Sequence, residues 1–179
     1  GNADYYGLAT ADFDGPAGPQ PPRLFLAGDS LKIAGLTSPG TGLIHWNGSE
    51  WESLPTPVEG AVQSIATWDP DGDGPQGEVL AACGIFGNAG TLGAAAIRVA
   101  MWDGSAWTDL NGPPGTAQFF PMTGFDRDRT GPLTPRLVVR RSGFGVAEIL
   151  SWDGLAWTDL NQGYFTSLTS SPTLWAVER

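Results

Sequence analysis

The sequence predicts an all-β protein, a β-propeller of three four-stranded blades and a partial fourth that forms an incomplete or assembled ring. Three observations predict this fold class. A Trp-rich phrase recurs three times, short apolar stretches alternate with turn residues, and no segment has the apolar periodicity of a long helix. Four short strands in roughly 50 residues are typical of one propeller blade.

The recurring phrase is WNGSEWESLP at 46–55, WDGSAWTDLN at 102–111 and WDGLAWTDLN at 152–161. Its Asn-Gly or Asp-Gly pair predicts a tight hairpin, because such turns need positive φ, which Gly adopts freely and Asn or Asp at modest cost. One Trp precedes each turn and another follows it, so two aromatic rings lie opposite each other across an antiparallel pair. Each phrase is therefore predicted to be the last hairpin of a small sheet, with its tryptophans in the core.

The same succession of segments precedes each hairpin. An apolar stretch that ends in an Asp/Gly cluster is typical of a strand followed by a turn, and a second apolar stretch follows it each time. The pairs are LATADFDG (8–15) and PRLFLAG (22–28), IATWDPDGDG (65–74) and EVLAACG (78–84), and MTGFDRD (122–128) and PRLVVR (135–140). A fourth copy begins at YFTSL (164–168) and enters a second strand at LWAV (174–177).

The spacing of the copies sets the predicted domain organisation. The first tryptophans of successive phrases are 56 and 50 residues apart, at Trp46, Trp102 and Trp152. We therefore predict a single domain over 1–179. Its blades lie at about 4–57, 61–113 and 117–163, with a partial blade at 164–179.

These segments resemble the kelch-like propeller repeats of secreted bacterial proteins, which are abundant in planctomycetes. The resemblance covers nearly the whole chain and implies a propeller that uses loops on one face for recognition. The Trp-Asp-Gly-x-x-Trp phrase is also similar to hairpins of fucose-binding propeller lectins, which bind between blades with aromatics plus an Arg and a Glu. The copies depart from the pattern at Asn47, in place of Asp, and at 138–141, where Val-Val-Arg-Arg replaces the usual Ala-Gly-Gly ending.

Composition argues against some classes of partner. The net charge is −10 and the pI about 4.2, so nucleic acid and anionic membrane surfaces are not expected partners. No run of about 20 apolar residues predicts a membrane-spanning segment. The single Lys, the acidic Trp-rich hairpins and a first residue other than Met favour an exported protein, extracellular, on the cell surface or periplasmic, that is processed or part of a longer product.

The best candidate for a chemical site is the loop DPDGDG at 69–74. Asp69, Asp71 and Asp73 place carboxylates at positions 1, 3 and 5 with a Gly at position 6, which is the spacing of a Ca²⁺ loop. The loop is similar to the calcium loops of integrin-type propellers, although Gly77 stands where those loops have Asp. The alternative is an Asp/Gly/Pro turn between strands, and no other cofactor is expected.

An enzyme is not predicted, and no catalytic residue is assigned. His45 is the only histidine and Cys83 the only cysteine, so neither a triad nor a zinc site can be assembled from the usual ligands. His45 is expected on a strand face and Cys83 as a buried free thiol. No carboxylate pair recurs in the three units, as convergent acid–base catalysis would need.

Three and a half blades leave two open ends, and exposed apolar faces and unpaired edges favour association. The sequence therefore predicts a non-enzymatic extracellular module with a protein-interaction or structural role, accessory to a larger assembly. Its partners are other protein subunits or further blades of the same protein. The alternative is a lectin-like propeller that binds a glycan, although no Arg/Glu pair recurs at equivalent places.

Overall fold

The all-β class is confirmed by the structure, a computed structural model. Its described residues contain twelve β-strands and no α-helix, and none of their segments is a helix that could cross a membrane. The predicted partial blade at 164–179 lies outside these residues. The structure describes residues 4–15, 18–33, 36, 41–72, 74, 76–88, 92–94, 96–112, 118–128, 133–143 and 146–161.

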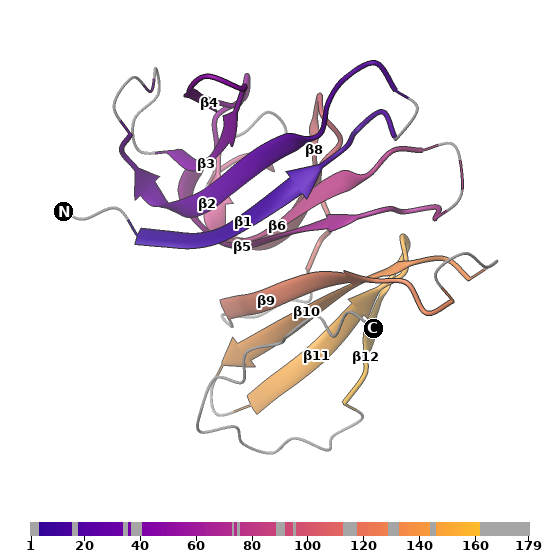
Figure 1. Ribbon diagram of the computed structural model, residues 1–179. Helices are drawn as coiled ribbons and strands as arrows, with labels where there is room; N and C mark the ends of the chain where they lie inside the picture. The colour runs from indigo at the N-terminus through magenta and orange to yellow at the C-terminus, as the bar shows by residue number, and fades with distance from the viewer. Residues whose placement is uncertain are drawn as a thin grey trace.

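The strands form three antiparallel four-stranded units that follow the predicted repeat (Figure 1). The first unit contains β1 (Asp4–Ala11), β2 (Arg23–Leu31), β3 (Thr41–Trp46) and β4 (Trp51–Ser53). The second contains β5 (Glu59–Trp68), β6 (Val79–Gly87), β7 (Ala96–Trp102) and β8 (Trp107–Asp109). The third contains β9 (Gln118–Phe125), β10 (Arg136–Gly143), β11 (Val146–Trp152) and β12 (Trp157–Asp159).

Two sheets result from these three units. The first and second units join into one eight-stranded sheet, because Asp29 pairs with Ala61 and Thr41 with Glu59. The third unit is a separate four-stranded sheet, and its β9 packs against β5. The described strands do not form a closed ring, so the propeller stays a prediction.

The Trp hairpins form as predicted, but only the tryptophans of the second unit are fully buried in the core, and those of the other two units are half-buried. Trp46 pairs with Trp51, and the equivalent pairs are Trp102 with Trp107 and Trp152 with Trp157. The ring centroids of these pairs are 5.6, 5.5 and 5.3 Å apart. The turn glycines have φ of 106°, 96° and 98°, which explains the need for Gly after Asn or Asp.

Each unit has two faces, which we name by their place in chain order. Directly opposed residues of an antiparallel pair point to the same face, so strand register identifies equivalent positions. The leading face is the one that packs on the preceding unit in the second and third units. It consists of Ile65, Leu80, Ala82, Ala100, Trp102 and Trp107 in the second unit, and of Met122, Leu137, Val139, Leu150, Trp152 and Trp157 in the third. The register places Leu8, Leu24, Leu26, Ile44, Trp46 and Trp51 at these positions in the first unit.

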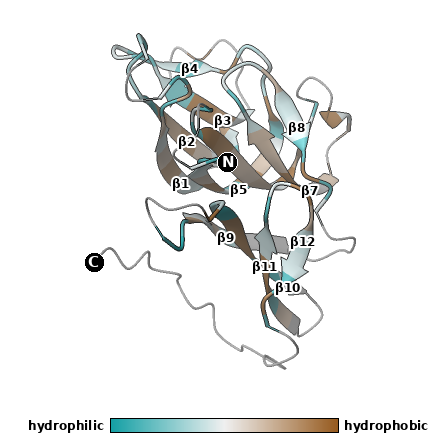
Figure 2. Ribbon diagram, turned by 90° about the vertical axis from the view of Figure 1, so that its right-hand side faces the viewer, coloured by the Kyte–Doolittle hydropathy of each residue, from teal (hydrophilic) through white to brown (hydrophobic). Residues whose placement is uncertain are grey.

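The opposite face of each unit is its trailing face. In the first unit it includes Ala11, Phe25, Ala27 and Leu43, which share a buried cluster with the leading face of the second unit. In the second unit it includes Trp68, Val79, Ala81, Cys83 and Val99, which share a second cluster with the leading face of the third. The core therefore lies between successive units. Figure 2 shows hydrophobic colouring on central strands such as β9 and paler or hydrophilic colouring on the short outer strands β4 and β8.

Gly77 lies beside a main-chain contact between the first two units, and we expect it not to tolerate a larger side chain. The N–H of Glu78 donates to the carbonyl of Asp12 at 3.1 Å, and the N–H of Asp12 donates to Glu78 Oε2 at 2.9 Å. A Cβ at neighbouring Gly77 would overlap the main-chain oxygen of Phe13. We expect Gly77→Ala to lower the free energy of unfolding by about 1–3 kcal/mol, as overpacking does. Urea denaturation measures it.

Gly7→Ala is the matched control, because a Cβ at Gly7 would meet Ile65 at an ordinary 3.5 Å. Equal destabilisation by the two substitutions would show that overlap with the Phe13 oxygen is not the cause of the lost stability.

Candidate functional site

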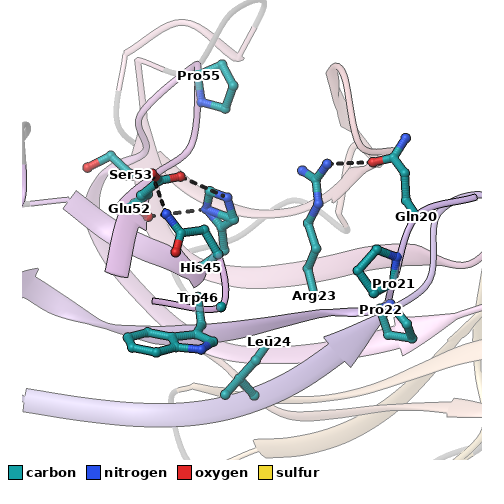
Figure 3. Close-up of a pocket in the computed structure, with 12 residues that line it drawn as sticks. Gln20, Pro21, Pro22, Arg23, Leu24, His45, Trp46, Glu52, Ser53 and Pro55 are labelled. Atoms are coloured by element: carbon teal, nitrogen blue, oxygen red, sulfur yellow. Dashed lines mark hydrogen bonds and ion pairs between the residues drawn. The ribbon is translucent and has the colours of Figure 1, made fainter. Parts of the chain in front are cut away.

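A hollow of about 690 Å³ opens beside the first unit, where β2 begins and β3 ends (Figure 3). The chain segment 20–24 forms one wall, and 45–48 with Glu52, Ser53 and Pro55 forms the other. The side chains of Arg23, His45 and Glu52 rise on one side of the sheet, while the Trp46 ring lies on the opposite side (Figure 3). The hollow therefore presents polar and charged side chains beside apolar ones such as Leu24 and Pro55, and its tryptophan belongs to the leading face.

Glu52 is the centre of one polar group in the hollow. Its Oε2 lies 3.7 Å from His45 Nε2, and its Oε1 accepts a hydrogen bond from Asn47 Nδ2 at 2.6 Å. The main-chain oxygen of Glu52 is 3.3 Å from His45 Nδ1. A neutral imidazole with its proton on Nδ1 donates to that oxygen. The carboxylate of Glu52 is thus held on the wall by Asn47, since a neutral imidazole with its proton on Nδ1 has only a lone pair at Nε2.

Arg23 supplies the positive charge on the facing wall. Its Nη2 donates to Gln20 Oε1 at 2.8 Å, which orients the guanidinium. A guanidinium donates hydrogen bonds and a carboxylate accepts them, so the two groups on facing walls can bind a polyol, an amide or a zwitterion.

The His45 imidazole is held in its neutral form. Burial lowers the pKa of His45 most, the charge of Arg23 lowers it further, and Glu52 opposes both. The ring stacks on Phe25 with centroids 6.0 Å apart. Its packing against Phe25 and its bond to the main chain make it a poor proton donor at neutral pH.

The lowered pKa predicts a pH dependence of stability. The folded-state pKa lies below the usual value of about 6.5, so the unfolded chain binds the proton more tightly. The free energy of unfolding should therefore fall as pH drops through about 6.5 and level off below the folded-state pKa. NMR titration of the ring gives that pKa, and urea denaturation gives the slope.

His45→Gln is the control for this prediction, since the difference in unfolding free energy between wild type and variant removes the contribution of the carboxylates. A difference that does not change with pH between 7.5 and 5 would contradict it. Arg23→Gln should raise the pKa of His45, because it removes the second cause of the shift.

The hollow has a partial counterpart in the third unit. A smaller hollow of about 410 Å³ is lined there by Arg136, Asp153 and Leu155, among others. Arg136 is equivalent to Arg23, since both begin their second strand and pair with the last residue of the first. Glu52 has no acidic equivalent, because Thr158 occupies its position opposite Ser151. The Arg/Glu combination is thus particular to the first unit.

The predicted calcium loop is only partly described. The structure brings Asp69 and Asp71 together, and Asp73 lies outside the described residues. Asp69 Oδ1 accepts hydrogen bonds from the N–H groups of Asp71 at 3.2 Å and Gly72 at 3.0 Å. Burial raises the pKa of the Asp69 carboxyl, and the side chain of Asp71 adds to this effect.

The carboxylates of this loop have a structural role that recurs in the third unit. Asp71 Oδ2 accepts the N–H of Gln76 at 3.2 Å, and Asp128 Oδ2 accepts that of Leu133 at 3.1 Å. Both aspartates keep one buried oxygen without a hydrogen-bond partner, which a cation could bind. No group of three or more metal-binding side chains occurs among the described residues, and calcium at Asp69, Asp71 and Asp73 stays a prediction.

Cys83 lies on β6 in the buried cluster between the second and third units, as predicted. Burial raises the pKa of its thiol, so the reactive thiolate is disfavoured.

Sequence reasoning missed the Arg23–Glu52 hollow. The two residues are 29 positions apart, and the search for an Arg/Glu pair required it in all three units, whereas the structure forms it in one. The sequence did contain a signal for this pair: Arg23 stands at the start of the second strand of its unit, and Glu52 stands in the middle of the fourth.

No protein-family model matches the chain, and none of the curated proteins or solved structures gives a significant match. The proposals below therefore depend on the geometry of the chain itself.

Proposed function

We propose that the chain is a non-enzymatic, exported propeller segment of the kelch-like kind that serves as an interaction or structural module of a larger assembly. One observation carries this proposal. Leu8 is 64% exposed, whereas Ile65 and Met122, at the equivalent leading-face positions, are each 7% exposed. The first unit thus offers a surface of the kind that the other two units bury.

The exposure of Leu8 depends on whether another unit packs in front of its strand. Ile65 and Met122 are buried because a unit packs in front of each, and Leu8 is exposed because none does within the described residues. Tyr5 and Tyr6 on the same strand are also exposed. Large exposed apolar side chains on one strand are consistent with a contact surface for another protein.

Part of the leading face is covered by the chain itself. Leu26 and Ile44 are buried together with Leu31, and Ile33 and Leu36 from the β2–β3 connection pack against them. The surface left for a partner lies on β1 and around Trp46, which is half-buried.

The composition supports export, and the packing of His45 supports a non-enzymatic role. Export is supported by the net charge of −10 and the single Lys among 179 residues. A non-enzymatic role is supported by the packing of His45, whose ring is bonded to the main chain and stacked on Phe25.

The test is capture of a partner from the source material. Wild-type protein should retain a protein that Leu8→Glu loses, because an unpaired carboxylate on the leading face opposes burial. The retained protein is identified by mass spectrometry and must rebind in purified form. Leu155→Glu is the control, since Leu155 is exposed on the turn of the third unit. Retention that is the same with Leu8→Glu would contradict the proposal.

A second candidate function is glycan binding in the hollow of the first unit. Arg23, Gln20, Asn47 and Glu52 line it and supply both donors and acceptors, as sugar hydroxyls require. Binding of a glycan seen on an array should be lost with Arg23→Ala and with Glu52→Gln, and kept with Arg136→Ala in the third unit. A silent array would end this candidate.

A further inference from the structure

We propose that the hollow of the first unit binds a small zwitterion, an amino acid or a short peptide, through its ammonium and its carboxylate. Glu52 and His45 accept hydrogen bonds from the ammonium, and Arg23 donates to the carboxylate. This site is separate from the leading face, because the three side chains lie on the trailing face. It takes a different ligand from the glycan that is the second candidate for the same hollow.

The three side chains form one row across three strands. Phe25 of β2 pairs with His45 of β3, and His45 pairs with Glu52 of β4. Arg23 stands two residues before Phe25 on β2, so its side chain points to the same face. Figure 3 shows all three side chains rising on one side of the sheet. A cationic, a neutral and an anionic group therefore follow one another across the first unit.

The second unit packs apolar side chains where the first unit has this row. Register places Val79 at the position of Arg23 and Met101 at that of His45. Val79 is 7% exposed, and Met101 packs against the buried cluster that contains residues of the second and third units. The first unit instead leaves a charged hollow of about 690 Å³, a volume that is usual for a small-molecule site. The repeat can thus fill these positions with core, and the first unit does not.

His45 and Glu52 present two hydrogen-bond acceptors side by side. The His45 ring is neutral and its Nδ1 lies 3.3 Å from the main-chain oxygen of Glu52, so Nε2 offers a lone pair. Glu52 Oε2 lies 3.7 Å from that Nε2. A hydroxyl has one proton and can serve one of these acceptors, whereas an ammonium has three and can serve both. The negative charge of Glu52 further favours a cationic donor over a neutral amide.

Arg23 determines that the ligand also carries an anion. Its bond to Gln20 is the one side-chain hydrogen bond that it makes in the described part of the chain. A guanidinium has five N–H groups in a planar fork, so donors remain for a carboxylate, which matches that fork. Arg23 would repel a ligand that is only cationic, and Glu52 would repel one that is only anionic. The two charges together therefore select a zwitterion.

The test is a screen by saturation-transfer NMR, followed by calorimetry of each ligand that binds. The probes are the twenty free amino acids and the dipeptides that each forms with alanine, which separates single amino acids from peptides. Each bound probe is compared with its N-acetylated and its C-amidated form. We expect both blocked forms to bind at least about tenfold more weakly, because each lacks one of the two charges. Binding that survives acetylation would overturn the inference.

Variants assign the groups of the ligand to side chains. Arg23→Gln and Glu52→Gln should each raise the dissociation constant at least about tenfold, with unchanged circular dichroism. His45→Phe removes the Nε2 acceptor but keeps a ring to stack on Phe25, and it should also weaken binding. Arg136→Gln is the matched control, because Arg136 begins the equivalent strand of the third unit. Equal binding by wild type and Glu52→Gln would contradict the assignment.

The remaining outcomes separate this inference from the proposed functions. If no zwitterion binds and a neutral disaccharide does, the glycan candidate is right and this inference is wrong. If neither binds, both assignments of the hollow are wrong. Leu8→Glu should bind the zwitterion like wild type, so loss of a partner protein through Leu8 tests the leading face alone.

Discussion

Trp102→Ala is expected to lower the free energy of unfolding by about 3–5 kcal/mol, which is the usual cost of removing a buried Trp. The Trp102 side chain is 2% exposed and lies in the cluster between the first and second units. Its ring also packs at 5.5 Å on Trp107 across the hairpin. Alanine would leave a cavity at an interface that holds the two units together, so both the unit and the interface lose contacts.

Trp46→Ala is the matched control, because Trp46 has the same place in the first unit and the same cross-strand partner, Trp51. It is half-buried and lacks a preceding unit within the described residues, so its loss should cost clearly less. Urea denaturation followed by Trp fluorescence measures both variants. Equal costs would contradict the assignment of leading faces.

Trp102→Phe keeps the comparison measurable where the alanine variant does not fold. It removes part of the ring and should cost less than Trp102→Ala but more than Trp46→Phe. The order of these two Phe variants is the decisive result.

Arg98→Met is expected to destabilise the chain by about 3 kcal/mol, because it leaves a set of buried acceptors without a donor. The Arg98 side chain is buried, and its Nη1 bonds Asp109 Oδ2 at 2.8 Å. It also donates to the main-chain oxygens of Phe86 at 2.8 Å, Leu92 at 2.8 Å and Ala94 at 2.7 Å. Methionine has the volume to fill the site but cannot donate to any of these oxygens.

Arg23→Met is the control for charge and volume, since Arg23 makes a single side-chain hydrogen bond, to an exposed Gln20, in the described part of the chain. It should cost less than about 0.5 kcal/mol. Asp109→Asn should also cost less than Arg98→Met, because Asp109 is partly exposed and the three main-chain bonds of Arg98 remain. A loss with Arg98→Met no larger than with Arg23→Met would contradict this account.

The hairpins and the order of strands could be predicted because their causes are local. An Asp-Gly or Asn-Gly pair between two tryptophans needs only a tight turn and a cross-strand contact, both within ten residues. The three repeats then place four strands in each unit, as the structure confirms. The calcium prediction depended on the same local spacing, but spacing does not show whether Asp69 and Asp71 cap a turn or bind an ion.

The sequence by itself therefore determined the all-β class, the three four-stranded units and the position of each Trp hairpin. Only the tertiary structure decided which residues are core and which are surface. Leu8, Ile65 and Met122 are similar side chains at one repeat position, and their burial differs because it depends on whether another unit packs in front of them. The hollow between Arg23 and Glu52 has the same origin, since only the pairing of β2, β3 and β4 brings residues 29 positions apart to facing walls.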